Sequence, residues 1–330
     1  MPEGHSVHRI ARQFNANFPG KPLQVSSPQG RFAAGAEMLD GGSIVEASAV
    51  GKHLFIEFER SEHLHVHLGI YGAWDFVGEV TVDATIASAN GRMGQTNQRG
   101  TILTEDEIFD AAGENSLTSI GAPRKSRFRF GEATKEMTAE EWPPEPVGQV
   151  RVRLQAADVL ADLRGPTTCE VISASEKLAI LDRLGPDPVT TPYDAGLEIF
   201  LQRAGSKKAP IGQLLMDQNV IAGIGNVYRA EILFRLGINP YTPGNALSKE
   251  LLTAIWDDWV RLLPEGIETG QMMTMDDLNE SEWIAAMANR DDRHWVYHRA
   301  GKPCRVCGTP ISLAEMQGRK LYWCANCQQQ

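Results

Sequence analysis

Hydrophobic and polar residues alternate in different ways along the chain. Near the N-terminus apolar side chains recur at helical spacing up to Pro19-Gly20, which predicts a first helix. These apolar positions are Val7, Ile10, Ala11 and Phe14. From about residue 22 the period becomes two, which is typical of half-buried strands joined by glycine-containing turns. The strands are expected at 43–47, 53–58, 63–68, 150–154 and 160–164.

The alternation is interrupted between residues 79 and 148 by an acidic segment rich in glycine and serine, which predicts an insertion with weak structure. A proline-rich linker at 184–193 then separates the strands from apolar runs with a helical period. Helices are expected at 194–204, 209–218, 226–236, 247–262 and 279–288. The predicted fold class is α+β, with an N-terminal β-sandwich domain over 1–184, a helical domain over 185–298 and a zinc finger over 299–330.

Composition narrows the class of protein. With 330 residues, 42% hydrophobic and 22% charged, the chain is expected to be globular with more than one domain. It has no apolar run of about 18 residues, and charges near the N-terminus argue against a signal peptide, so we expect a cytoplasmic protein without membrane contact. The net charge of −10 argues against a nucleic-acid partner, yet residues 201–240 and 285–330 carry a basic excess.

Four of the five cysteines lie at the C-terminal end in two pairs with a two-residue spacing, Cys304 with Cys307 and Cys324 with Cys327. Two such pairs separated by 16 residues match a four-thiolate zinc site on a hairpin. Because four protein ligands leave no open coordination position, we expect one structural Zn²⁺ per chain.

A glycine-bearing turn between two apolar segments is the most informative stretch of the helical half. Gly223 and Gly225 interrupt the apolar pattern, and Asn226 stands where a helix N-cap is expected. Free N–H groups and the positive end of the helix dipole at such a turn suit a DNA phosphate. Taken alone, Asn226 is more often a structural cap than a ligand.

Four separated features together resemble the formamidopyrimidine-DNA glycosylase and endonuclease VIII family of bacterial repair enzymes. They are Pro2-Glu3-Gly4, Lys52 in Val50-Gly51-Lys52-His53-Leu54, the turn just described within a helix–two-turn–helix segment, and the cysteine hairpin. They occur in the family's order across residues 2 to 327. The resemblance implies a base-excision repair enzyme that binds damaged DNA, single-stranded or duplex, and can work as a monomer.

The resemblance also implies roles for individual residues. Pro2, once Met1 is removed, offers a secondary amine that attacks C1′ of the damaged nucleotide, and its unperturbed pKa is about 8. Glu3 protonates the opening sugar ring or relays protons. Lys52 contacts the phosphate beside the lesion and assists proton transfer to the departing base. Asn226, beside Gly225, and Arg319 of the zinc hairpin match positions that grip the flanking phosphates while the base flips out.

Departures from the family pattern bear on the substrate. Ile70 occupies the position where the formamidopyrimidine branch has methionine, and the loop expected at 165–169 lacks the arginine and phenylalanine that fill the space of the flipped base. Residues 266–289 lack the long loop used for oxidised purines. The chain is therefore predicted to be closer to the endonuclease VIII branch and to act on oxidised pyrimidines, with a preference for unpaired lesions.

Several alternatives stay open at this point. The chain could instead be mainly an abasic-site lyase or an oxidised-purine glycosylase, or a DNA-binding zinc protein without catalysis. His5 could tune the nucleophilic amine, although a histidine early in a helix is more often a surface or core residue. Cys169 could be an inert buried thiol or a groove-facing substitute for the missing aromatic side chain.

Overall fold

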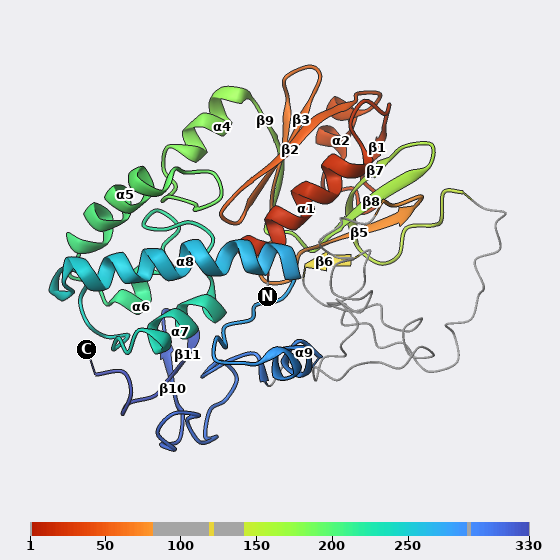
Figure 1. Cartoon of the computed structure of the whole chain (residues 1–330). Helices are drawn as coiled ribbons and strands as arrows, with labels where there is room; N and C mark the ends of the chain where they lie inside the picture. The colour runs from red at the N-terminus through yellow and green to blue at the C-terminus, as the bar shows by residue number, and fades with distance from the viewer. Residues whose placement is uncertain (1, 82–118, 122–141, 289–291, 330) are drawn as a thin grey trace.

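The computed structural model describes residues 2–81, 119–121, 142–288 and 292–329. Two antiparallel sheets form the framework of the described residues up to Ile172 (Figure 1). The four-stranded sheet has the order β2 (Ile44–Val50), β3 (His53–Phe58), β4 (His63–His67) and β9 (Thr168–Ile172). The five-stranded sheet has the order β1 (Gln24–Ser26), β7 (Val150–Gln155), β8 (Val159–Arg164), β5 (Ala73–Gly78) and β6 (Ser119–Gly121).

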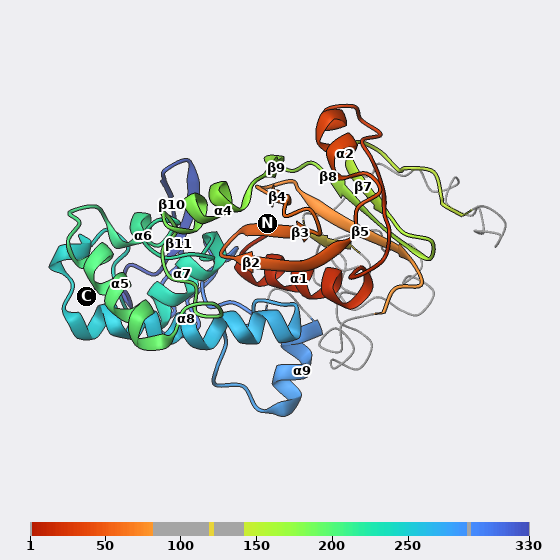
Figure 2. The same ribbon diagram turned by 90° about the horizontal axis from the view of Figure 1, so that it is seen from above.

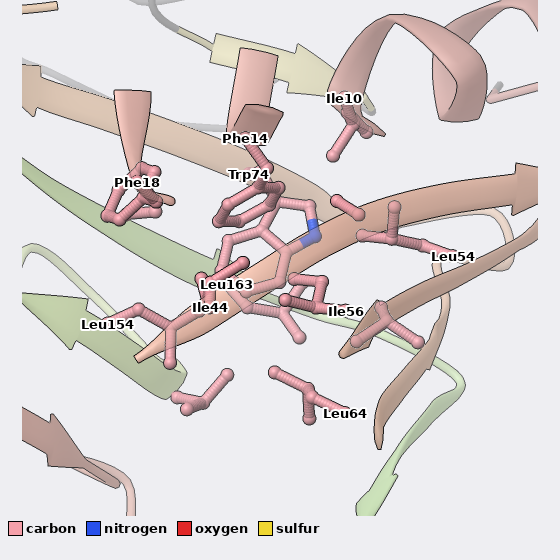
Figure 3. Close-up of a cluster of buried hydrophobic side chains, with 14 of the residues drawn as sticks. Ile10, Phe14, Phe18, Ile44, Leu54, Ile56, Leu64, Trp74, Leu154 and Leu163 are labelled. Carbon is pink, nitrogen blue, oxygen red and sulfur yellow. The ribbon is translucent and has the colours of Figure 1, made fainter. Parts of the chain in front are cut away.

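The apolar faces of both sheets form one core with helix α1 (Gly4–Asn17), while α2 (Ala33–Leu39) covers one end. Alternate residues of each strand point inward, as the period of two requires. Figure 3 shows Phe14 of α1 against Trp74 of β5, with ring centroids 4.9 Å apart in an edge-on arrangement. The predicted N-terminal helix and β-sandwich are therefore confirmed.

The predicted insertion at 79–148 lies mostly outside the described residues. Residues 119–121 form the edge strand β6, which pairs with β5. On the far side of the insertion, β7 and β8 pair with each other, and β8 also pairs with β5, so the sheet resumes after the interruption as predicted.

Helices dominate the second half of the chain. They are α4 (Ala174–Leu181), α5 (Tyr193–Gly205), α6 (Ile211–Leu214), α7 (Asn226–Arg235), the 3₁₀ turn η2 (Gly244–Ala246), α8 (Lys249–Thr269) and α9 (Glu280–Ala288). The helix expected at 209–218 is shorter than predicted, because after Leu215 the backbone bonds change to a three-residue spacing, Met216 to Gln213 and Asp217 to Leu214. Helix α8 continues past Pro264 and ends at Gly270, whose φ of 70° is left-handed.

Helix α8 joins the two halves of the molecule. It packs against α5 and α7 of the helical half and also against α1 of the sandwich half, as Figures 1 and 2 show. The chain ends in the hairpin of β10 (Ser312–Met316) and β11 (Arg319–Trp323), which packs against α7. Among the described residues, no helix is both long and apolar enough to cross a membrane.

Candidate active site at the junction of the two halves

The side chain of Glu3 caps a helix that begins more than 220 residues later in the chain. Its carboxylate accepts hydrogen bonds from the N–H groups of Gly225 at 2.9 Å, Val227 at 2.9 Å and Tyr228 at 3.4 Å, at the N-terminus of α7. Burial raises the pKa of Glu3, whereas the charge of Lys52 and these N–H groups oppose the increase. Glu3 and the buried Pro2 before it therefore lie at the start of α7.

This contact corrects two predictions about the turn. The N-cap of α7 is Gly225, and Asn226 is the first helical residue, whose side chain does not cap the helix. The N–H of Gly225 is not free for a phosphate, because it donates to Glu3. A side chain at Gly225 would overlap the Glu3 carboxylate, so glycine is required there for close approach.

Three glycines let the backbones of both halves touch beside this cap. The Gly4 N–H donates to the Gly223 carbonyl at 2.9 Å, and Gly223 has a left-handed φ of 91°. A Cβ atom at Gly51 would come within 2.8 Å of the Cβ of Ala222. The N-terminal segment, the β2–β3 turn and the glycine turn of the helical half thus meet at one place.

Lys52 reaches across the same junction. Its Nζ donates to the Ile224 carbonyl at 2.6 Å, so this residue is not simply an exposed turn lysine. Burial lowers the pKa of Lys52 to about 8, and the positive charges of Arg319 and Arg229 contribute in the same direction, whereas Glu3 opposes it. A lysine with this pKa can both carry charge and exchange a proton near neutral pH.

Asn226 connects α7 to the cysteine hairpin. Its Nδ2 donates to the Lys320 carbonyl at 2.9 Å, and its Oδ1 accepts from the guanidinium of Arg229. Arg229 is fully buried and also donates to the Lys320 carbonyl at 3.1 Å. These bonds hold the strand that begins at Arg319 beside the junction, so the cations of Lys52, Arg229 and Arg319 gather there.

The cysteine hairpin forms the predicted zinc site. The Sγ atoms of Cys304, Cys307, Cys324 and Cys327 all lie within 4.8 Å of one another. The Cys304–Cys327 and Cys307–Cys324 pairs are 3.8 and 3.5 Å apart, too far for disulfides. Zn–S bonds of about 2.3 Å in a tetrahedron separate sulfur atoms by about 3.8 Å, so this set fits one structural Zn²⁺.

Two buried carboxylates that sequence reasoning missed hold this arrangement together. Asp187, in the linker, accepts hydrogen bonds from the Gly51 N–H at 2.6 Å and from His8 Nε2 of α1 at 2.8 Å. Glu231 of α7 accepts from the N–H groups of residues 295–297 and from the Thr274 hydroxyl, all within 2.9 Å. In the sequence, a buried carboxylate could have been recognised only as a charged residue within an apolar run. Glu231, which lies among the apolar residues of α7, shows this pattern clearly.

The structure also decides the environments of the residues left open by the sequence. Cys169 lies on β9 and packs against the N-terminal core, where burial raises the pKa of its thiol to about 12, so it is an inert thiol and not a groove residue. The expected loop at 165–169 is thus shorter, since its last two residues belong to β9. His5 is buried against Tyr228, and burial lowers its pKa to about 3.

Three segments of the chain match known protein families. Residues 1–169 match the formamidopyrimidine-DNA glycosylase N-terminal domain, residues 184–277 match the formamidopyrimidine-DNA glycosylase H2TH domain, and residues 301–330 match the zinc finger found in FPG and IleRS.

Similar sequences and structures cover the whole chain. Proteins named Endonuclease 8 1 from Mycobacterium tuberculosis and Mycobacterium bovis are 38% identical over 328 residues, 99% of this chain and 100% of each relative. A formamidopyrimidine-DNA glycosylase from Prochlorococcus marinus is 36% identical over 45% of this chain and 49% of its own length. A solved complex of Lactococcus lactis Fpg with abasic-site DNA has a TM-score of 0.68 at 18% identity and covers 99% of this chain and 100% of its own.

The family matches and full-length relatives agree with the geometry of the junction. The N-terminal segment, the lysine turn, the glycine turn and the cysteine hairpin, which suggested the resemblance, are in mutual contact or linked by hydrogen bonds. The chain therefore belongs to the formamidopyrimidine-DNA glycosylase and endonuclease VIII family of DNA repair glycosylases.

Proposed function

We propose that this chain is a bifunctional DNA glycosylase and abasic-site lyase that removes oxidised pyrimidines, with the amine of Pro2 as nucleophile. The observation that carries the proposal is the convergence of three separated segments. Glu3 binds the start of α7, and Lys52 binds the carbonyl of Ile224, the residue directly before the N-cap Gly225. Glu3 and Lys52 can exchange protons beside the candidate nucleophile Pro2, and further cations lie close by. Such a set of groups suits chemistry on a phosphodiester strand.

In the proposed reaction, the nitrogen of unmasked Pro2 forms a bond to C1′ of the damaged nucleotide. The bond from C1′ to the base breaks, its electron pair goes to the base, and the base takes a proton with the help of Lys52. The carboxylate of Glu3 takes the proton that the Pro2 nitrogen loses and passes it to O4′ as the sugar ring opens, which leaves an iminium. Loss of a C2′ proton then eliminates the 3′ phosphate, and a second elimination releases the 5′ phosphate.

The cations of the junction support DNA as the substrate despite the acidic total charge. Lys52, Arg319 and the amide of Asn226 are the proposed phosphate contacts, and Asn226 and Arg319 are held in one unit by the hairpin bonds. Because the remaining surface does not touch DNA, its negative charge does not prevent binding. The solved structures of Lactococcus lactis Fpg with DNA that share this fold are consistent with such a partner.

The choice of oxidised pyrimidines rests on two features. The relatives that match the full length of the chain are named Endonuclease 8 1. The loop at 69–72 presents Ile70 and Tyr71, which are 42% and 71% exposed, and the Tyr71 carbonyl lies against Gly165 of the neighbouring loop. These two exposed apolar side chains, with no arginine or phenylalanine from the neighbouring loop, are the proposed filling of the space left by a flipped base.

The experiment is borohydride trapping on strands that contain thymine glycol, dihydrouracil, 8-oxoguanine or an abasic site. Reduction of the iminium should join the protein covalently to DNA, with the pyrimidine lesions trapped faster than 8-oxoguanine. An uncut tag before Pro2 should abolish trapping but spare DNA binding, and the same tag at the C-terminal end should change neither. Trapping on the abasic strand alone would favour the lyase alternative, and binding without trapping would favour the zinc protein without catalysis.

We also propose that the enzyme prefers lesions that are already unpaired, because few side chains are available to replace the flipped base in the duplex. Single-turnover rates on the same lesion in single-stranded and duplex DNA test this preference. An equal or higher rate on the duplex contradicts it.

A further inference from the structure

A row of histidines lies on the outer face of the four-stranded sheet. His63, His65 and His67 of β4 share this face because alternate residues of a strand point the same way. His67 pairs in register with His53 of β3, and His65 pairs with Glu170 of β9. The residues between the histidines of β4 point into the N-terminal core. The cluster therefore crosses three strands and ends at the residue after Lys52.

Two hydrogen bonds connect three of these residues in series. His65 Nδ1 lies 2.9 Å from Glu170 Oε1, and His65 Nε2 lies 2.9 Å from His53 Nδ1. A carboxylate only accepts hydrogen bonds, so the proton of a neutral His65 is on Nδ1 and its Nε2 is an acceptor. His53 must then donate through Nδ1, which leaves Nε2 of His53 as a lone pair.

Packing and burial keep the chain of bonds in this orientation. The His65 ring is 4% exposed and lies nearly parallel to the rings of Phe55 and His53, with ring centroids 4.9 and 5.2 Å away and interplanar angles of 11° and 12°. Burial lowers the pKa of His53 to about 3. Burial also lowers the pKa of His65, although Glu170 opposes this decrease. Both imidazoles are therefore neutral near pH 7, as the series of bonds requires.

The open end of the series is at His53, the residue that follows Lys52 in the chain. His53 is half-buried, its ring lies edge-on to His67 at 5.1 Å, and Lys52 precedes it in the chain. Its Nε2 has no hydrogen-bond partner within the part of the chain that the structure describes. His67 is oriented in the opposite sense, because its Nδ1 accepts the Gly69 N–H at 3.2 Å and leaves Nε2 as a donor. Two neighbouring rings thus offer one acceptor and one donor beside Lys52.

We propose that the Glu170–His65–His53 series fixes His53 Nε2 as a neutral hydrogen-bond acceptor for a donor group of the damaged nucleotide. Phosphate oxygens carry no donor at neutral pH, so this position does not add a phosphate contact. The donors available on a damaged nucleotide are an N–H or O–H of the base and the O4′ hydroxyl that forms when the sugar ring opens. His53 is then a specificity-determining residue, and this role rests on the proposed glycosylase function.

Substitution of His53 tests the contact. For H53A we expect base excision from a thymine glycol strand to slow by about 3- to 10-fold, the usual effect of one lost neutral hydrogen bond. If the donor is on the base, cleavage of an abasic strand stays unchanged, and if the donor is the O4′ hydroxyl, both reactions slow equally. Unchanged rates on both strands overturn the proposal.

Substitution of Glu170 tests the series without changing the contact residue. The Glu170 side chain is 52% exposed, so E170A is expected to fold and to carry the test even if H53A does not. It should slow base excision by about 2- to 3-fold, because His53 then populates both tautomers. The matched control is E57A, since Glu57 lies 3.5 Å from His63 on the same sheet face but outside the series. Equal rates for E170A and E57A overturn the proposal.

Long-range ¹H–¹⁵N spectra of the histidine rings give a readout independent of activity. The Nδ1–H form of His53 is expected in the wild-type chain and in E57A, and a mixture of tautomers in E170A. An Nε2–H form in the wild type overturns the inference. If the wild type excises the base and H53A and E170A do so at the same rate, this inference alone is overturned. If the wild type neither excises the base nor is trapped by borohydride, the proposed function is overturned as well.

Discussion

Replacement of Glu3 by glutamine separates the structural role of this carboxylate from its proposed chemistry. In the wild type one oxygen accepts the Val227 N–H at 2.9 Å, and the other accepts the N–H groups of Gly225 at 2.9 Å and Tyr228 at 3.4 Å. The glutamine side chain has one oxygen and one NH₂ group. In either orientation the NH₂ faces at least one backbone N–H that no longer has an acceptor.

The energetic cost follows from burial of the site. Glu3 is fully buried, so water cannot replace the lost acceptor. A buried N–H left unpaired costs about 1–3 kcal/mol, and loss of negative charge at a helix N-terminus costs about 0.3–2 kcal/mol. We therefore expect E3Q to lower the free energy of unfolding by about 3 kcal/mol. For a chain of 330 residues that unfolds in one step, this corresponds to a decrease in Tm of about 4 °C.

Calorimetry and urea unfolding measure this loss, and E176Q is the matched control. Glu176 occupies the N3 position of a capping box at the exposed N-terminus of α4, where glutamine makes the same bond, so its change should stay within about 0.5 kcal/mol. Base excision by E3Q, measured below its Tm, should fall by about 10²–10⁴-fold if Glu3 is the proton donor. A Tm within 1 °C of the wild type would refute the capping argument whatever the activity.

Four further predictions test the remaining contacts. K52R should excise the base at least about tenfold more slowly than the wild type at pH 7. In pH–rate profiles the wild-type rate should fall above about pH 8, because Lys52 with its lowered pKa loses its proton there, and K52R should not show this fall. D187N should lose about 2–4 kcal/mol in urea unfolding, because one oxygen of Asp187 accepts from Gly51 and His8 and the other from the Val189 N–H, so an amide NH₂ faces a donor in either orientation. C324S should lose zinc by metal analysis and should bind DNA more weakly, while the circular dichroism of the sandwich half persists. E231Q should weaken DNA binding in fluorescence anisotropy but keep its zinc, because it loosens residues 295–297 and not the thiolates.

Local patterns in the sequence were sufficient for most elements of the fold. The period of two at 53–58 and 63–68 predicted β3 and β4 correctly, because alternate residues of each strand point into the N-terminal core. The helix expected at 247–262 is longer than predicted, because α8 accommodates Pro264 and continues to Thr269. The cysteine spacing predicted the zinc site, because four ligands within one hairpin are close in sequence as well as in space.

The contacts that assemble the junction could not be predicted in this way, because each joins residues distant in sequence. Asn226 was expected to cap α7, since its side chain is suited to a local cap, yet Glu3 takes this position from the other half of the chain. The carboxylate brings charge as well as acceptors to the helix dipole, so it outcompetes a neutral amide for this position. Asn226 is thereby left to bind the Lys320 carbonyl and join the zinc hairpin to α7. Because Glu3 caps α7 and Asn226 binds the hairpin, the proposed nucleophile segment, helix α7 and the zinc hairpin are joined to one another.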